Sequence, residues 1–295
     1  MMKRMMTILP ALFFAAALLV RPLDASHAVQ SGLSLCGRTV IPALFPLFAV
    51  TAFLLQSGAT RFLHLLCAPL MIPLFHLRGV CAVPLLAGLV GGYPTGAKTT
   101  AELYEQGTIT KAEAELLLGF CNNCGPGFLL GFTGSVLGSP RLGAYLLVVH
   151  TTAALLTGMI LCRLPRRWEP PSLPCSLPAL NVSLPQALTR SVSSALASTL
   201  SICAYVVLFQ TAAAMLPDLS PAVVGAVELV SGITMLSPDR TGFLTAAALI
   251  GWGGCSVHCQ TMAVTGDLSI RYHTAGKLLQ AILSIPLALI AFSLQ

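Results

Sequence analysis

The chain has 295 residues, of which 56% are apolar and only 9% are charged, and its mean hydropathy is +0.84. Soluble domains usually carry about 25% charged residues, so this composition excludes an ordinary soluble protein and indicates an integral membrane protein. The net charge of +6 does not indicate nucleic-acid binding, because the Arg and Lys residues lie mostly between apolar runs, as the positive-inside rule expects of short loops.

The apolar runs predict an all-α, polytopic membrane protein with about 8–10 helical segments. The first run, in "MMKRMMTILPALFFAAALLVRP", has the basic start of a signal peptide. No A-x-A cleavage site follows it, and further apolar runs come later, so we interpret it as a short first span. The ten cysteines are scattered through apolar sequence, which does not resemble a disulfide framework.

Proline and glycine interrupt several of the later runs, as in "VIPALFPLF", "CAPLMIPLF" and "LVGGYPTGAK". These interruptions are typical either of ordinary kinked helices or of the discontinuous helices found in transporters. Irregular backbone at membrane depth is tolerated where it is buried in protein or lines a cavity. We therefore favour discontinuous helices.

A Pro-rich, initially basic linker at 163–185 divides the sequence into an N-terminal membrane half, 1–162, and a C-terminal membrane half, 186–295. The halves resemble each other weakly, because "GLVGGYPTGAKTT" aligns with "GWGGCSVHCQTMA" through three glycines if a small gap is allowed. Glycine-interrupted segments in two halves indicate the binding site of a transporter. We expect two related halves.

The stretch "TTAELYEQGTITKAEAELLLG" between two of these interruptions contains helix-end signals. Gly107 predicts a helix stop, and Thr110 with Glu113 predicts a capping box at the start of the next helix. We expect Lys111, Glu113 and Glu115 to form a solvated interfacial face of that helix.

The motif "FCNNCGPGF" has two interpretations. Cys121 and Cys124 have C-x-x-C spacing, and together with Cys255, His258 and Cys259 they would supply ligands for a divalent metal. Alternatively, Asn122 and Asn123 precede a Gly-Pro break, and a half-helix starting near Gly127 would direct its N–H groups at an anion or polar ligand. We favour the second interpretation and expect no metal or cofactor.

Glu228 is the strongest single candidate, because it lies inside the apolar run "SPAVVGAVELVSGITMLSP", where a carboxyl group is costly and functional by default. It suits proton coupling or cation binding, or it is a structural acid bonded to a neighbouring helix. Ser231 and Gly232 would supply a second break. Lys98 either snorkels to a headgroup or faces an anionic substrate, whereas His150 and His258 are more typical of packing between helices.

The segment "GGYPTGAKTTAELYEQGTITKAEAELLLGFCNNCGPGF" resembles the central signature of the sporulation integral membrane protein YlbJ family, and "GWGGCSVHCQ" resembles its second glycine motif. That family belongs with the Gate, or nucleoside-recognition, membrane domains, which are similar to parts of nucleoside transporters and ferrous iron permeases. The resemblance implies a transporter-like protein of the outer forespore membrane that moves dipicolinic acid. We expect the family to have serine in place of Cys124.

These observations together predict a secondary-transporter-like protein that is not an enzyme. The predicted partners are the lipid bilayer and a small anionic substrate, with a possible homo-oligomer and no nucleic acid. Alternatives are a non-transporting assembly factor for sporulation and a transporter of nucleosides or divalent metals. The residues that we expect to bind substrate or couple its transport are Thr95, Lys98, Asn122, Asn123, Glu228, Ser256 and Gln260.

Overall fold

The computed structural model describes residues 12–57, 59–164, 183–216 and 219–294, and every regular element in those ranges is helical. The all-α prediction is therefore confirmed. Four helical stretches are long and apolar enough to cross a membrane, namely Pro140–Arg163, Leu184–Ala214, Arg240–Thr265 and Arg271–Ser293. Two bent pairs, Leu12–Val20 with Pro22–Val40 and Cys67–Phe75 with Gly79–Gly91, raise the number within the described ranges to as many as six. The multi-pass membrane prediction is confirmed as well.

Most of the linker, and the basic start of the chain, lie outside the described residues, which omit 1–11 and 165–182. The division of the chain into two halves at this linker stays a proposal. The described structure nevertheless contains the same pair of features on either side of it: a helical hairpin followed by an interrupted helix.

From Pro22 to the linker, the described part of the first half contains eleven elements, including two π-helices and one short 3-10 helix. They are α2 (Pro22–Leu35), η1 (Cys36–Val40), α3 (Ile41–Gln56), α4 (Ala59–Phe75), η2 (Gly79–Cys81), α5 (Ala82–Gly91), α6 (Thr95–Glu105), α7 (Lys111–Leu117), η3 (Gly127–Thr133) with α8 (Gly134–Val136), and α9 (Pro140–Arg163). The prolines of "VIPALFPLF" and "CAPLMIPLF" lie within α3 and α4, which continue through them. The prediction of discontinuous helices is therefore wrong at these two places, where the alternative of an ordinary helix containing proline holds.

The chain reverses its direction at residues 91–94, which have the sequence Gly-Gly-Tyr-Pro. α5 ends at Gly91, Gly92 has a φ of 75°, and α6 begins at Thr95. Gly88 and Gly96 would be roughly 12 Å apart along a straight helix, yet a Cβ on Gly88 would lie 3.2 Å from Gly96 Cα. α5 and α6 therefore form a hairpin whose arms touch at two glycines.

The second half repeats this hairpin in α11 (Pro221–Val227) and α12 (Leu229–Thr234). A Cβ on Gly232 would lie 2.1 Å from Gly225 Cα, so these helices also fold back and meet at glycines. The turn is at Glu228, whose backbone is extended with φ −134° and ψ 110°. The break predicted at Ser231 and Gly232 is thus wrong by three residues, because those two residues lie inside α12.

An interrupted helix follows each hairpin. α13 (Arg240–Trp252) stops at Gly253, whose left-handed φ of 86° starts α14 (Gly254–Thr265). In the first half, α7 is separated from η3 by a stretch in which residues 118–125 are non-helical. Sequence alignment paired "GGYPTGAK" with "GWGGCSVHC", but the former is a hairpin turn and the latter an interruption within a span. "FCNNCGPGF" is the segment of the first half that, like "GWGGCSVHC", contains a break between two helices.

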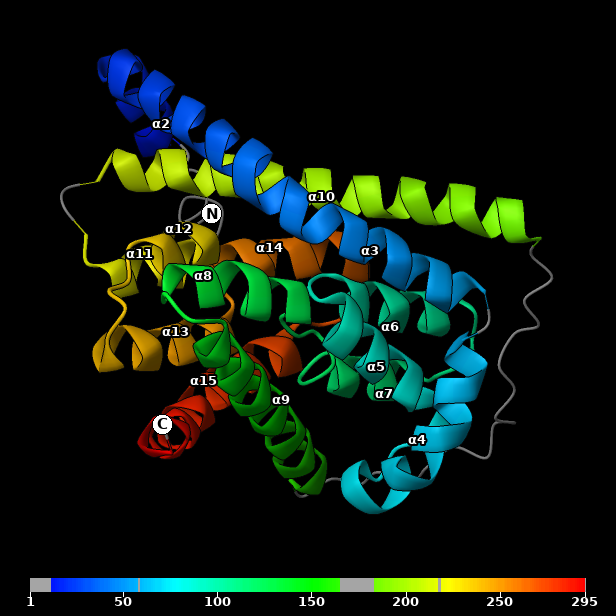
Figure 1. The fold of residues 1–295 in the computed structure, drawn as a ribbon. Coiled ribbons are helices and arrows are strands. Elements are labelled where there is room, and N and C mark those ends of the chain that lie inside the picture. The colour runs from blue at the N-terminus through cyan, green and yellow to red at the C-terminus, as the bar shows by residue number, and fades with distance from the viewer. Residues whose placement is uncertain (1–11, 58, 165–182, 217–218, 295) are drawn as a thin grey trace, which may run out of the picture.

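The interrupted helices occupy the centre of the molecule, and longer helices surround them (Figure 1). α10 (Leu184–Ala214) packs along α2 and α3, while α15 (Arg271–Ser293) packs against α9 and α13. In the apolar window of α13–α14, 67% of residues are buried, against 28% in α10 and in α15. The outer helices thus present their apolar faces outward, as lipid contact requires.

The helix-end signals of the segment 107–113 are confirmed, but the predicted solvated face is not. Gly107 has a φ of 67° after α6, and Thr110 and Glu113 form the capping box of α7. Glu113 has 0% exposure, and its carboxylate accepts hydrogen bonds from Arg78 Nε (2.7 Å) and Nη2. Lys111 is exposed as predicted, but the solvated interpretation is wrong for Glu113, because an arginine 35 residues earlier supplies the countercharge that makes burial tolerable.

We expect Glu113→Gln to lower the stability of the folded chain by about 3 kcal/mol, because breaking one side of a buried ion pair leaves the other charge in low dielectric. Thermal unfolding in detergent measures the effect. Glu115→Gln on the same helix is the control: Glu115 accepts one backbone N–H, from Ser269 at 3.0 Å, which a glutamine oxygen also accepts. Equal shifts for the two variants would contradict the assignment.

Candidate functional site: a pocket where four chain breaks meet

The two hairpin turns and the two helix interruptions come together at one place. Gly92 of the first turn packs on Gly125 of the first interruption, since a Cβ on Gly92 would lie 2.9 Å from Gly125 N. Tyr93 Oη donates to Ile250 O at 3.0 Å, next to the second interruption. Trp252 Nε1 donates to Ala226 O at 3.0 Å, which ties that interruption to the second turn. Segments from across the chain thus converge on a single centre.

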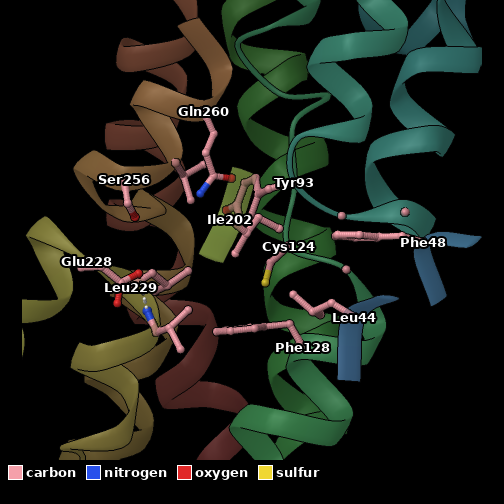
Figure 2. A pocket seen from close by; sticks show the side chains of 15 residues that line it. Leu44, Phe48, Tyr93, Cys124, Phe128, Ile202, Glu228, Leu229, Ser256 and Gln260 are labelled. Atoms are coloured by element: carbon pink, nitrogen blue, oxygen red, sulfur yellow. Dashed lines mark hydrogen bonds between the residues drawn. The ribbon is translucent and has the colours of Figure 1, made fainter. Parts of the chain in front are cut away.

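A pocket of about 500 Å³, counting the space at its mouth, opens at this centre (Figure 2). Residues of both hairpin turns, of the first interruption and of the first turns of α14 line it, and α3 and α10 close it with Leu44, Phe48 and Ile202. Most of the lining is apolar, and a few polar groups project from the hairpins and α14. Apolar walls with a few convergent polar groups are typical of a small-molecule site.

Glu228 lines this pocket from the turn of the second hairpin, with a side chain that is 1% exposed. Its two carboxylate oxygens accept N–H groups of Val230 (3.1 Å) and Ser231 (2.6 Å) at the start of α12. The carboxylate therefore caps a helix N-terminus, where both the free N–H groups and the helix dipole favour negative charge.

Ser256 and Gln260 reach the same pocket from the first turns of α14. They are spaced i, i+4 on one helix face, and both are at most 3% exposed. Gln260 Oε1 is buried without a hydrogen-bond partner. Buried polar atoms are nearly always paired, so this oxygen is suited to accept a hydrogen bond from a bound molecule.

Thr95 and Lys98 lie in a neighbouring pocket, formed by α6 with α3 and α10. Lys98 Nζ donates to Ser194 Oγ at 2.9 Å, and the same pocket holds Thr99, Glu102 and Ser198. Phe48 lines both pockets. Five of the seven predicted site residues are thus divided between two adjoining cavities.

Asn122 and Asn123 are fully buried and line neither pocket. Asn122 Nδ2 donates to Thr261 Oγ1 on α14 at 2.8 Å. Asn123 Nδ2 donates to Phe120 O (2.7 Å), and its Oδ1 accepts from Gln280 Nε2 (3.2 Å). Both asparagines connect the first interruption to other helices directly behind the pocket wall. The half-helix predicted near Gly127 is confirmed, because η3 begins there.

A family model described as Gate, nucleoside recognition, matches residues 38–219, which is more than half of the chain. The chain belongs to the Gate family. The matched range runs from η1 through α10, so it includes the first hairpin and the first interruption. The sporulation integral membrane protein YlbJ of Bacillus subtilis (strain 168) is 26% identical over 307 aligned residues, covering 88% of this chain and 75% of that protein. No solved structure matches the chain significantly.

The cysteines of this Gate-family chain do not form a metal centre among the described residues, where no three His, Cys, Asp or Glu side chains are placed to hold an ion. Cys121 contacts Thr100 Oγ1 at 3.2 Å, Cys124 lines the pocket, and Cys255 is exposed. The ligand set proposed from the sequence is thus dispersed.

We expect Cys121→Ser/Cys124→Ser to bind no less zinc than the unmodified chain. Serine differs from cysteine by one atom, so the fold should be kept, whereas a thiolate site would lose its ligands. Metal content after dialysis against zinc, measured by elemental analysis, checks this. A stoichiometric ion lost in the double variant would contradict the structure's placement of these thiols.

Sequence reasoning missed the polar side chains behind this Gate-family pocket. Lys277 and Gln280 on α15 are both fully buried, and Lys277 Nζ donates to Gln280 Oε1 at 2.8 Å. Gln280 Nε2 in turn contacts His150 O at 3.3 Å, and His150 Nε2 accepts the Cys124 N–H at 3.0 Å. The available signal was a lysine within the apolar run after "YHTAG", since an ionisable group inside a membrane segment is a site candidate by default.

Proposed function

We propose that this chain is a sporulation-associated membrane transporter for a small anion, with dipicolinic acid as substrate and the outer forespore membrane as its location. The observation that carries the proposal is the convergence of two hairpin turns and two helix interruptions on one pocket. In transporters, discontinuous helices bring backbone dipoles and polar side chains to a substrate at the membrane midplane. The sporulation role is transferred from the relative's name.

The two adjoining pockets supply a route. The cavity around Lys98 and Thr95 is the more polar and contains one basic and one acidic side chain, Lys98 and Glu102, so it suits an entrance for a polar solute. Phe48 separates it from the apolar pocket that holds Glu228. We propose that the substrate passes this phenylalanine on its way to the inner pocket.

The inner pocket suits an aromatic substrate with polar edges. Its walls include the rings of Tyr93, Phe48 and Phe128, and polar groups are supplied by Ser256 and Gln260. A negatively charged Glu228 would repel an anion, whereas a protonated one would not. We therefore propose that a proton enters with the anion.

Reconstitution of the purified full chain in liposomes tests the proposal. We expect uptake of dipicolinate above that of protein-free liposomes, stimulated by an inward proton gradient. Failure to take up dipicolinate in correctly folded preparations would contradict the proposed substrate. A non-transporting assembly factor would give no uptake of any solute.

A nucleoside is the second candidate substrate, because the family model is described as nucleoside recognition. Nucleosides are uncharged and also present an aromatic face with polar edges. Uptake of radiolabelled uridine and adenosine in the same liposomes distinguishes the two, and uptake of a nucleoside in place of dipicolinate would favour this candidate.

A further inference from the structure

Lys277 is a buried cationic side chain that no other part of the mechanism uses. It has 0% exposure on α15, at the level of the first interruption. Ion pairs within the described residues join Arg21 to Asp24 and Arg78 to Glu113, and neither involves Lys277. Burying an ammonium group without a countercharge is costly by several kcal/mol, so the structure lacks the partner that this lysine would need in its charged form.

The neighbours of Lys277 are dipoles and an aromatic ring. One of its three N–H donors bonds to Gln280 Oε1 at 2.8 Å. Its Nζ lies 5.2 Å from the centroid of the Tyr93 ring, within the range of a cation–π interaction. Cation–π contacts and a neutral amide stabilise an ammonium group partly, but they do not neutralise it.

These neighbours place Lys277 directly behind the pocket wall. Tyr93 lines the pocket and touches Lys277. Cys124 also lines the pocket, and its N–H donates to His150, which contacts Gln280. One layer of side chains therefore separates the lysine from a bound molecule, and charges act strongly over such a distance in a medium of low dielectric.

Glu228 does not cancel this charge. Its carboxylate is already held by two N–H groups at the N-terminus of α12, and no ion pair links it to Lys277 among the described residues. The two ionisable groups act from different walls, Glu228 at the second hairpin and Lys277 behind the first.

We propose that Lys277 makes this pocket selective for anions over uncharged molecules of the same shape, with the bound anion as its missing countercharge. Lys277 is thus a specificity-determining residue that acts through the layer of Tyr93 and Cys124 and does not touch the substrate. The inference rests on the proposed function in one respect, namely that the transported molecule is an anion. It does not require that this anion be dipicolinate.

The test compares anions with uncharged analogues of the same shape. Ligands are dipicolinate and pyridine-2,6-dicarboxamide, together with phthalate and phthalamide, titrated into the purified full chain in detergent. For Lys277→Met we expect dissociation constants of the anions to rise about ten-fold or more, while those of the amides change little. Lys277→Arg keeps the charge and should keep most of the preference for anions.

The possible outcomes separate the two proposals. If phthalate but not dipicolinate binds, and binding depends on Lys277, the dipicolinate assignment fails and the role of Lys277 stands. If the Lys277→Met variant still prefers anions, the role of Lys277 is overturned. The same holds if the preference for anions is lost in Lys98→Met and not in Lys277→Met. A parent chain that prefers the amides, or binds neither class, overturns it as well.

Discussion

Glu228→Gln is expected to reduce dipicolinate uptake into liposomes by about 10- to 100-fold, the range expected when a hydrogen bond to a charged group is lost. The variant keeps the shape of the side chain but cannot take up or release a proton. If anion entry is coupled to protonation at this carboxyl group, stimulation by the proton gradient should vanish together with the bulk of the uptake.

The hydrogen bonds around Glu228 allow this effect to be separated from a structural one. The same carboxylate caps α12 through Val230 N and Ser231 N, and loss of a cap costs about 0.5–2 kcal/mol. Thermal unfolding of the variant measures that part. Ser231→Ala is the matched control, because it keeps both the backbone N–H that donates to Glu228 and the carboxyl group itself.

Uptake by Glu228→Gln at the level of the parent chain, with the proton stimulation intact, would remove Glu228 from the mechanism. It would also favour the structural interpretation of this acid, in which its role is confined to capping α12. Glu228→Asp extends the series: aspartate is an equally good cap and retains the charge, so partial uptake is expected from this variant.

The sequence predicted most of the architecture because composition and periodicity are local signals. Low charge and long apolar runs are sufficient to predict an all-α membrane protein, and Thr110 with Glu113 is sufficient to predict a helix start. The glycines at 91–92 and 253–254 mark real interruptions, because positive φ angles favour glycine. Glu228 was predicted as a site residue because a carboxyl group inside an apolar run is energetically costly, and the structure places this residue in a pocket.

The errors arose where distant segments decide the structure. Nothing near Glu113 in sequence reveals that Arg78 pairs with it. Proline at 46, 69 or 73 resembles a break, but the helices continue through these residues, as neighbouring helices and local adjustments allow. Whether a glycine run reverses the chain or merely interrupts a span depends on what packs against it, so "GGYPTGAK" and "GWGGCSVHC" were paired although their local structures differ.

The residues behind the pocket were missed for a related reason. Lys277 and Gln280 are spaced i, i+3, which places them on one face of α15, but the sequence does not show that this face points inward. The packing of α15 against α9 and α13, together with Tyr93 and Asn123 from the first turn and the first interruption, buries it. Asn123 and the missed lysine belong to one hydrogen-bonded network, joined through Gln280.

Gly88→Ala is expected to prevent the first hairpin from closing, with the largest effect on folding of any single methyl group added at this centre. A Cβ at Gly88 would lie 1.7 Å from Cys121 O and 3.2 Å from Gly96 Cα. Both obstacles are backbone, so no side chain can rotate away, and overpacking of this kind costs about 1–3 kcal/mol or more. We expect a lower unfolding temperature and a smaller monodisperse fraction in detergent.

Gly131→Ala is the control for this prediction. Gly131 lies in η3, and a Cβ there would meet nothing within 4 Å. Because alanine has the higher helix propensity, this variant should be neutral or more stable by up to about 1 kcal/mol. If Gly88→Ala behaves like Gly131→Ala, the close contact between the first hairpin and the "FCNNCGPGF" segment is wrong. The pocket that depends on this contact would then have to be redrawn, because Gly92 and Gly125 meet at the same crossing.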